Sequence, residues 1–395
     1  MIRTVKAFDL KGQRILMRVD FNVPIENGRV TDEFRILGAL PTIRYCLDVG
    51  ATVVLMSHLG RPGGEVKMEY SLIPAGETLA GMLEMPIKFS NDCISQDAID
   101  TSLGLKPGEI HLLENLRFHH GEVENNSEFS ASLARHGRVF INDAFGTTHR
   151  AHASNVGVAE HFRNRGIGFL IEKEIQYLKG VIKNPKRPMV LILGGAKIGS
   201  KLKLVEKLMD QTDSILIGGG MAFTFLNASG LSVGGSLLDQ TMLNKAKSIL
   251  NRARSRGIEL ILPVDVYSGK STVDTVPKGP MAVNEIPDNL LGLDIGPKTL
   301  ERFADALDHA RTIVWNGPVG MFEVPGYERG SKQLALILAK MKDEGKTVIV
   351  GGGDTAAALK TFGLMDAMSH VSTGGGASLE LLIGNPLPAL QSLEV

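Results

Sequence analysis

Short apolar runs alternate with longer amphipathic stretches along the whole chain. The apolar runs are continuous and rich in Val, Ile and Leu, as expected of strands that are buried on both faces. The stretches between them repeat apolar residues at helical spacing. In TLERFADALDHA, for example, Leu300, Phe303 and Leu307 fall on one face of the predicted helix. The nine predicted strands lie within residues 14–20, 51–58, 109–115, 138–145, 189–195, 214–220, 258–265, 312–318 and 347–354.

Alternation of buried strands with helices indicates parallel sheets that are covered by helices on both faces. The strands form two series, so the sequence predicts an α/β protein with two doubly wound, Rossmann-like domains. A polar helix within 172–188 ends at Asn184 and Pro185 and leads into a basic connector, which is typical of a domain boundary. We therefore expect residues 1–172 and 173–383 to form the two domains, joined by this long helix as a hinge.

Composition and charge limit the number of domains, the classes of partner and the cellular compartment that we expect for this chain. Its 395 residues favour two or three domains at about 150 residues each. Lys and Arg together number 43, as do Asp and Glu, so we expect no general attraction to nucleic acid or to an anionic membrane. We expect neither a signal peptide nor a membrane-spanning segment. Cys46 and Cys93 belong to no C-x-x-C motif, and two free thiols indicate a reducing cytoplasm.

Polar residues follow the predicted strands of the first half of the chain. Ligands of doubly wound sheets bind outside the carboxyl ends of the strands. Arginine suits bidentate recognition of carboxylate or phosphate. One such arginine is usually a solvated surface residue, but several at successive strand ends predict a site for a small, multiply charged anion. The candidate residues are Asp20, Asn22, Arg35 at the start of the first helix, His58, Arg61, Arg117 and Arg150.

Glycines follow the strands of the second half. Glycine allows close backbone approach, and amides at a helix N-terminus bind phosphate. Tight turns are the simpler explanation for single glycines, whereas triplets such as 218–220 and 351–353 favour a nucleotide. The dinucleotide motif G-x-G-x-x-G is absent because its sixth position is Phe223, and LILGGAKIGSK does not complete a P-loop. Lys197 and Lys201, four residues apart, are expected on one face of a helix, where each meets a phosphate.

Single acids and histidines allow more than one interpretation. Asp354 is either a helix N-cap or a carboxylate directed at Mg²⁺ that is held mainly by phosphates. Glu323 either accepts hydrogen bonds from a ribose or is a surface acid. His119 and His120 are expected to be solvated, with nothing nearby to make them metal ligands.

A small anion in one domain and a nucleotide in the other fit phosphoryl transfer, which needs mainly positioning and charge stabilisation from a protein. The two lobes would close to bring the ligands together and exclude water. An NAD-dependent dehydrogenase and a non-catalytic anion-binding protein of two lobes remain as alternatives.

Nine motifs in order resemble those of the phosphoglycerate kinase family and cover essentially the whole chain. They are RVDFNVP, SHLGRP, ENLRF, DAFGTTHRAHAS, GGAKIGSK, GGGMAFTF, WNGPVGMFE, GGGDTAA and STGGGASLELL. The resemblance implies reversible transfer of the acyl phosphate of 1,3-bisphosphoglycerate to MgADP, giving 3-phosphoglycerate and MgATP. It also implies a monomer, Mg²⁺ as cofactor, and a C-terminal segment, 384–395, that returns to the N-terminal domain.

The resemblance also implies roles for individual residues. Neither direction needs a general base, because the attacking oxygen belongs to ADP or to a carboxylate that is ionised at neutral pH. The phosphoglycerate site would comprise Asp20, Phe21, Asn22, Arg35, His58, Leu59, Gly60, Arg61, Arg117 and Arg150. The nucleotide site would comprise Gly195, Ala196, Lys201, Gly219, Gly292 and Leu293 along the adenine, Asn316, Pro318, Glu323, Gly351, Gly352, Gly353, Asp354 and Thr355. Arg35, Lys197 and Gly375 would be catalytic, and Asp354 would contact the metal.

Overall fold

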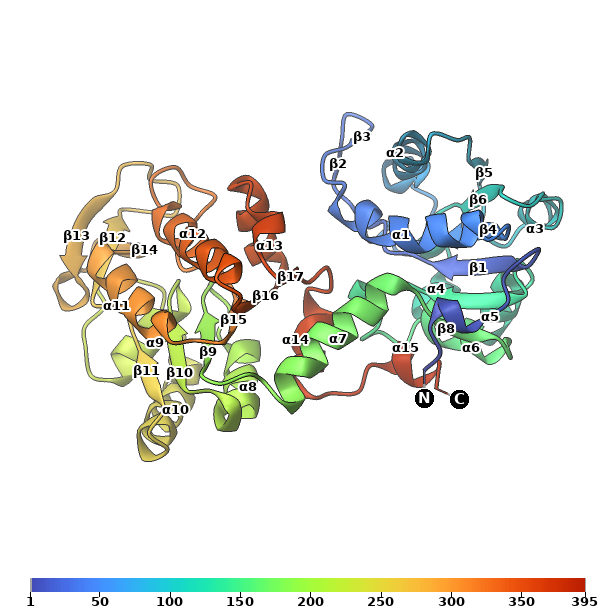
Figure 1. Ribbon diagram of the computed structural model, residues 1–395. Coiled ribbons are helices and arrows are strands. Elements are labelled where there is room, and N and C mark those ends of the chain that lie inside the picture. Colours follow the sequence, from blue (N-terminus) through green and yellow to red (C-terminus); the bar gives the residue numbers. More distant parts are fainter. Residues whose placement is uncertain (1, 395) are drawn as a thin grey trace. The chain divides into compact units, whose positions relative to one another are not determined.

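The computed structural model describes residues 2–394, with Ile182 described by its backbone alone (Figure 1). The chain divides into two compact units, Met1–Gln176 with Pro386–Val395, and Tyr177–Asn385. The division falls within helix α7 (Phe169–Lys183). Ile2 pairs with Glu394 in an antiparallel bridge, so both ends of the described chain lie side by side in the first unit. Among residues 2–394, no helix has the length and apolar character needed to cross a membrane.

The first unit is built on a parallel sheet of six strands in the order β5-β6-β4-β1-β7-β8. Four of the predicted runs form its four inner strands, and almost every residue of these strands is buried, as expected for a sheet covered on both faces. The sequence did not predict the edge strands β5 and β8, which are only three residues long and lack an apolar run. The six strands are β1 (Arg14–Arg18), β4 (Thr52–Met56), β5 (Lys88–Ser90), β6 (Ile110–Leu113), β7 (Val139–Asn142) and β8 (Arg165–Ile167).

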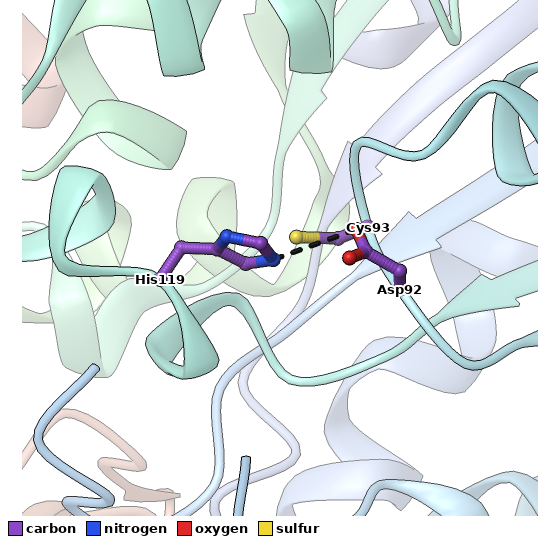
Figure 2. Close-up of side chains that lie close together, drawn as sticks. All are labelled: Asp92, Cys93 and His119. Carbon is purple, nitrogen blue, oxygen red and sulfur yellow. Dashed lines mark ion pairs between the residues drawn. The ribbon is translucent and has the colours of Figure 1, made fainter. Parts of the chain in front are cut away.

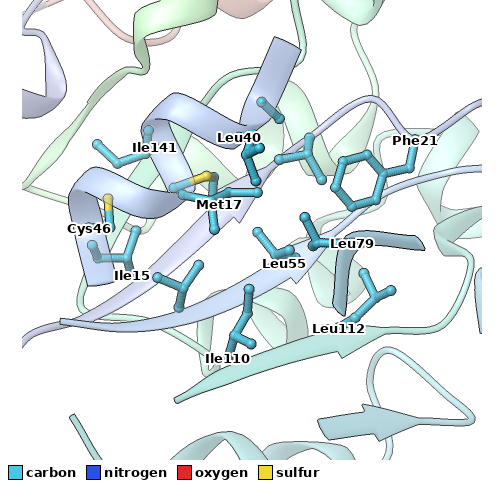
Figure 3. Packing of buried hydrophobic residues seen from close by; sticks show 14 of the residues in the cluster. Ile15, Met17, Phe21, Leu40, Cys46, Leu55, Leu79, Ile110, Leu112 and Ile141 are labelled. Atoms are coloured by element: carbon cyan, nitrogen blue, oxygen red, sulfur yellow. The ribbon is translucent and has the colours of Figure 1, made fainter. Parts of the chain in front are cut away.

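Helix α1 (Phe34–Asp48) covers one face of this sheet with a continuous apolar stripe. Ile36, Leu40 and Ile43 recur at helical spacing and are buried. They belong to one hydrophobic cluster with Ile15 and Met17 of β1 (Figure 3). This packing fixes the start of α1 relative to the end of β1, where the candidate anion site begins. The remaining elements of the unit are hairpin β2 (Ile25–Glu26) and β3 (Arg29–Val30), and helices α2 (Ile73–Leu83), α3 (Gln96–Leu103), α4 (His120–Val123), α5 (Ser127–Ala134), α6 (Val158–Glu160) and α15 (Pro388–Gln391).

The second unit is built on another parallel sheet of six strands, in the order β11-β10-β9-β15-β16-β17. Strands β10 and β11 lie on one side of β9, and strands β15, β16 and β17 lie on the other side. The strand order therefore reverses between β9 and β15. In doubly wound sheets this reversal opens a crevice at the carboxyl ends of the two strands. The predicted class, two doubly wound α/β units, is therefore confirmed. The strands are β9 (Met189–Leu193), β10 (Ser214–Ile217), β11 (Glu259–Ile261), β15 (Thr312–Asn316), β16 (Thr347–Gly351) and β17 (His370–Val371).

The sequence did not predict a small antiparallel sheet, β13-β12-β14, in the second unit. The run 258–265 was expected to be one strand, but β11 ends at Ile261 and Asp265 begins β12 (Asp265–Gly269). Strands β13 (Lys278–Ala282) and β14 (Leu291–Ile295) flank it. The predicted helices within 299–310 and 330–345 are observed as α11 and α12. The helices of the unit are α8 (Gly199–Leu208), α9 (Met221–Ala228), α10 (Leu243–Ser255), α11 (Pro297–Asp308), α12 (Arg329–Asp343), α13 (Gly353–Thr361) and α14 (Gly376–Ile383).

Candidate active site

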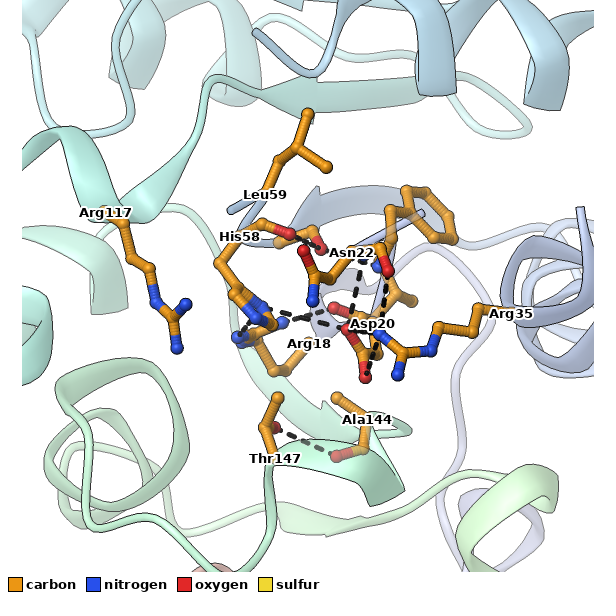
Figure 4. Close-up of polar contacts among 12 residues, drawn as sticks. Arg18, Asp20, Asn22, Arg35, His58, Leu59, Arg117, Ala144 and Thr147 are labelled. Carbon is orange, nitrogen blue, oxygen red and sulfur yellow. Dashed lines mark hydrogen bonds and ion pairs between the residues drawn. The ribbon is translucent and has the colours of Figure 1, made fainter. Parts of the chain in front are cut away.

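Polar side chains gather at the carboxyl edge of the first sheet (Figure 4). Asp20 and Asn22 follow β1, and Arg35 lies in the first turn of α1. The Arg35 guanidinium lies 3.4 Å from a carboxylate oxygen of Asp20 and donates to the Asn22 carbonyl at 2.7 Å. These contacts hold Arg35 at the edge of the sheet, where about a third of its side chain remains exposed to a ligand.

His58, which follows β4, is an uncharged hydrogen-bond donor surrounded by arginines. Burial is the largest influence that lowers the pKa of His58 well below its usual value, and the guanidinium of Arg18 is the next. Arg18 Nη2 lies 3.1 Å from His58 Nδ1 and can only donate, so Nδ1 accepts and the ring proton resides on Nε2. The 3.8 Å approach of Asp20 to Nδ1 is therefore no salt bridge, because the imidazole is neutral.

The sequence analysis missed Arg18, the last residue of β1. Its side chain is fully buried, and its Nε donates to Ser154 Oγ at 2.8 Å. The Ser154 hydroxyl in turn donates to the buried carboxylate of Glu122 at 2.7 Å. Although burial alone would raise it, the pKa of Glu122 is lowered by His152, Arg18 and Ser154, so the acid is ionised. A charged residue within the apolar run ILMRVD was the available signal, because a buried charge requires a partner.

Arg117 lies in the short helix η3 (Leu116–Phe118) that follows β6, and it has an unsatisfied donor. Its Nη1 donates to the Gly60 carbonyl at 2.6 Å, whereas its buried Nε has no hydrogen-bond partner among the described residues. Burial, followed by Arg150 and Arg18, lowers the pKa of Arg117 to about 10, so the group stays cationic at neutral pH. A buried unpaired donor is rare in proteins and fits an absent anionic ligand.

Arg117 and two further predicted residues, Arg61 and Arg150, line a pocket of about 500 Å³. Arg61 is exposed and Arg150 is half-buried, so both guanidiniums can reach a bound molecule. The pocket is also lined by Gly63, Gly64, His119, His120, Val123, Glu124 and His152. A pocket of this size and charge suits a small molecule with several negative groups.

Three other predicted residues of this site serve as scaffold. The Phe21 ring is part of the hydrophobic cluster under α1, and its amide donates to Ser57 Oγ at 2.8 Å. Leu59 is bound through both its amide and its carbonyl to Asn115. The amide of Gly60 donates to the Asn22 side chain at 2.9 Å. These contacts place Asn22, His58 and Arg117, and the direct contact of the three residues with a ligand stays a prediction.

In the second unit, three loops meet at the carboxyl ends of β9, β10 and β15. The Gly195 amide donates to the Pro318 carbonyl at 2.6 Å, and the Gly219 amide donates to the Val319 carbonyl at 3.0 Å. A side chain at Gly194 or Gly317 would collide with the facing backbone. The loops pack so closely on one another that these two positions must be glycine. This agrees with the simpler explanation given above, that single glycines allow tight turns.

Lys201 and Lys197 do not share a helix face, so that prediction is wrong. Helix α8 begins only at Gly199, which leaves Lys197 exposed in the preceding loop beside Ala196. Lys201 is buried in the first turn, and its ammonium donates to the Gly194 carbonyl. Burial lowers the pKa of Lys201 to about 8, against the opposing influence of Asp354. The Lys201 ammonium lies beside Gly195 and Gly317, and the sequence did not show that these two loops meet around it.

The loop after β16 has glycines that close packing does not explain. A side chain at Gly353 would meet no atom within 4 Å, and its backbone conformation is ordinary. Gly352 is the N-cap of α13, so the interpretation of Asp354 as the N-cap is wrong; Asp354 lies exposed in the first helical turn. Thr355 is buried and accepts from the Gly317 amide at 2.7 Å, which joins this loop to the loop after β15.

The remaining nucleotide candidates lie in different settings. Gly292 belongs to antiparallel strand β14, where a side chain would collide with the Phe223 ring, and Leu293 beside it is buried. Glu323 is exposed in the segment after β15. Gly375 is the N-cap of α14 and has a positive φ of 48°. The other candidates flank the loop cluster: Asn316 at the end of β15, Pro318 after it, and Gly351 at the end of β16.

His119 is not fully solvated, in contrast to the sequence expectation. Its side chain is 28% exposed, and its Nε2 lies 3.4 Å from a carboxylate oxygen of Asp92. The neighbouring His120 is exposed, as expected.

Comparisons with known proteins place the chain among full-length relatives. The family model for phosphoglycerate kinase matches residues 5–385. A phosphoglycerate kinase of Thermosipho africanus is 46% identical over 99% of this chain and 97% of its own length. One of Synechococcus elongatus is 45% identical over 100% of this chain and 98% of its own. The solved phosphoglycerate kinase of Coxiella burnetii superposes with a TM-score of 0.88 at 38% identity, covering 100% of this chain and 99% of that one.

Proposed function

This chain belongs to the phosphoglycerate kinase family, and we propose that it transfers the acyl phosphate of 1,3-bisphosphoglycerate reversibly to MgADP, giving 3-phosphoglycerate and MgATP. It is a phosphotransferase with a carboxyl group as acceptor, acting in glycolysis and its reverse. Two features support the proposal. An arginine-lined pocket lies at the edge of one parallel sheet, and the Lys201 ammonium lies among glycine loops at the edge of the other. The dehydrogenase and the non-catalytic anion-binding protein are not favoured, because the family match extends over residues 5–385.

We place phosphoglycerate in the first unit. The Nε2–H of neutral His58 donates to the substrate without adding charge, while Arg61, Arg117 and Arg150 meet its phosphate and Arg35 reaches its carboxyl end. The unpaired Nε of Arg117 supports this placement, because a phosphate oxygen would satisfy it. Arg18 acts through His58, whose orientation and proton position it sets.

We place the nucleotide in the second unit. Amides near Gly353 can approach its phosphates closely, because no protein atom occupies the space beside that residue. Lys201, whose pKa is lowered to about 8 by burial, supplies positive charge close to the loop after β9. Lys197 is exposed beside this loop and is proposed to meet the phosphoryl group during transfer, together with Arg35 and amides near Gly375.

Mg²⁺ is proposed as the cofactor, held mainly by the nucleotide phosphates and by Asp354. The exposed Asp354 carboxylate in the first turn of α13 fits such a contact, since Mg²⁺ usually binds proteins through one or two carboxylates and keeps phosphates and waters as its other ligands. The ion would neutralise charge on the phosphates. The protein's part is positioning, because neither direction of transfer requires a general base.

We further propose a cytoplasmic monomer that acts on small molecules and has no nucleic-acid or membrane partner. The balance of 43 basic and 43 acidic residues supports the part about nucleic acid and membranes, because the chain has no net attraction for polyanions. Phosphoryl transfer must take place away from water, which requires the two units to close. This closure stays a prediction from the sequence.

A coupled assay tests the function directly. Product formation should require ATP and 3-phosphoglycerate together, and chelation of Mg²⁺ should abolish it. Turnover with NADH and a 2-oxo acid, or no turnover with either pair of substrates, would reject the proposal.

Lys197→Ala tests the transfer step. Removal of one preorganised donor to the moving phosphoryl group should lower kcat by about 10²–10³-fold. Lys203→Ala is the matched control, because Lys203 is an exposed lysine of α8. A kcat for Lys197→Ala equal to that of the control would remove Lys197 from the mechanism.

A further inference from the structure

Three side chains with different metal-binding atoms converge behind the anion pocket. Asp92 and Cys93 lie in the loop between β5 and α3, and His119 ends helix η3 (Figure 2). The carboxylate oxygen, the thiol sulfur and the imidazole nitrogen all lie within 4.8 Å of one another. The three residues come from two separate segments of the chain, and the proposed transfer reaction assigns no role to any of them.

We propose that Asp92, Cys93 and His119 form a binding site for a thiophilic divalent cation of the Zn²⁺ class. Zn²⁺ accepts sulfur, nitrogen and oxygen ligands in a tetrahedron whose ligand atoms are about 3.3–3.8 Å apart, given bonds of about 2.0–2.3 Å. The 3.4 Å separation between His119 Nε2 and the Asp92 carboxylate already matches one edge of such a tetrahedron. Mg²⁺ prefers oxygen ligands alone, so the site differs in class from the nucleotide's metal.

The groups that surround the three ligands hold them in place. The Asp92 carboxylate accepts from the amides of Ile94 at 2.6 Å and Ser95 at 3.2 Å. The Cys93 carbonyl accepts from the ring of buried His136 at 3.0 Å. The His119 ring packs on Phe129, with 5.3 Å between ring centroids. Outer contacts of this kind orient ligands and raise metal affinity.

The local charge favours a cation, and the anion pocket provides access to it. The carboxylates of Asp92, Glu122 and Glu114 all place negative potential at the Cys93 thiol, which is buried. His119 lines the anion pocket, so an ion can approach from that side and solvent can supply the fourth ligand. Binding forms a bond from the metal to Cys93 Sγ and breaks the S–H bond, and the proton leaves to solvent.

Zinc titration of the chelator-treated protein, without substrates, tests the proposal. Competition with a chromophoric chelator should reveal one tightly bound equivalent. Cys93→Ala and His119→Gln should each weaken it by at least about 100-fold, the upper end of what loss of an outer contact costs. Cys46→Ala and His120→Gln are the matched controls and should keep the tight equivalent, since Cys46 is a buried thiol of α1 and His120 is the exposed neighbour of His119.

Two outcomes overturn the proposal: no tight equivalent in the unchanged protein, or a tight equivalent that survives in Cys93→Ala. If Cys93→Ala fails to fold by circular dichroism, His119→Gln decides, because its side chain is partly exposed. Co²⁺ gives an independent result with the unchanged protein. It should produce a thiolate-to-cobalt charge-transfer band, and cobalt binding without that band excludes Cys93 as a ligand. None of these measurements depends on the phosphotransfer activity.

Discussion

His58 illustrates how the anion site obtains a donor without adding a charge. The buried Arg18 guanidinium donates to its Nδ1 and leaves the proton on Nε2. Burial and the surrounding arginines keep the pKa of the ring well below its usual value, so its charge does not change near neutral pH. The arginines supply the positive charge, and the imidazole supplies one oriented, uncharged hydrogen-bond donor. Affinity for the anion in this pH range therefore depends on the arginines, of which Arg117 has the clearest unsatisfied group.

Replacing Arg117 by Ala should raise the KM for 3-phosphoglycerate by about 10–100-fold, because hydrogen bonds to charged groups contribute about 1.5–3 kcal/mol each. The KM for ATP and the value of kcat should change far less. Arg135→Ala is the control, since Arg135 is an exposed arginine of the same unit. Steady-state kinetics with each substrate varied decides, and an unaltered KM for 3-phosphoglycerate would place Arg117 outside the site.

Lys201 should make nucleotide binding depend on pH above neutrality. Burial lowers its pKa to about 8 from 10.5, so the free protein loses this positive charge as pH rises through 8. Bound phosphates favour the charged form, so binding should take up a proton near pH 8 and weaken between pH 7 and 9.5. Calorimetry in two buffers of different ionisation enthalpy measures this uptake. Lys201→Met should abolish it and Lys203→Met should retain it; equal uptake in both variants would contradict the assignment.

At the scale of elements, α3, β5, β6 and the turn that follows α5 are joined by a buried chain of hydrogen bonds whose direction is fixed while both histidines are neutral. His136 Nε2 must donate to the Cys93 carbonyl, so its Nδ1 accepts from Ser102 Oγ at 2.7 Å. The Ser102 oxygen then accepts from His111 Nδ1 at 2.9 Å, and His111 Nε2 accepts from Ser90 Oγ at 2.8 Å. This arrangement satisfies both rings while they are neutral, and a second ring proton would require a serine hydroxyl of the chain to turn and accept it.

Acid should therefore weaken the first unit. Burial is the main cause that lowers the pKa of His111 and of His136 from 6.5 to about 4. Between these values the unfolded chain takes up protons that the folded chain refuses, so stability falls as pH drops from 6.5 to 4. One pKa unit corresponds to about 1.4 kcal/mol, so protonation of each histidine lowers the free energy of unfolding by up to about 3 kcal/mol. Buried Asp143, whose pKa burial raises to about 7, adds stability as pH falls over the same range, so urea unfolding of the unchanged protein is compared with that of His136→Gln. The same pH dependence in both would contradict the neutral chain.

Ser102→Ala tests the same chain of hydrogen bonds at neutral pH. The substitution leaves His111 Nδ1 without an acceptor and His136 Nδ1 without a donor, both in the interior. The free energy of unfolding should fall by about 1–3 kcal/mol for each group left unpaired. Ser127→Ala, at the exposed start of α5, is the control and should change little. An equal effect of both substitutions would show that the hydroxyl of Ser102 contributes no more than a surface one.

At the scale of the whole molecule, the proposed function assigns a different ligand to the carboxyl edge of each of the two parallel sheets. Hydrogen exchange should separate the two sites. With 3-phosphoglycerate alone, amides of 57–61 and 115–118 should slow, and with MgADP alone, amides of 194–201 and 351–355 should slow, because a ligand protects the segments that it orders. Protection of the first set by MgADP alone, without the second, would reverse the proposed assignment.

Periodicity and the ends of apolar runs were enough to predict most inner strands, helices α11 and α12, and the two doubly wound units. Those features depend on neighbours along the chain and on which faces must be buried. The same reasoning failed for the edge strands β5, β8 and β17, which are two or three residues long and gain their stability from pairing with neighbouring strands. It also failed for the antiparallel sheet, whose five-residue strands lack a continuous apolar run.

The sequence by itself determined which residues follow the strands, and the motifs around them indicated the family that the comparisons confirm. Only the tertiary structure decided what those residues do. It buried Arg18 beside His58, kept Lys197 outside α8, and bonded Leu59 to Asn115 and Gly60 to Arg117. It also brought Asp92 and Cys93 to His119. The physical reason is that burial, hydrogen-bond direction and ligand geometry depend on contacts between segments far apart in sequence, which no local pattern encodes.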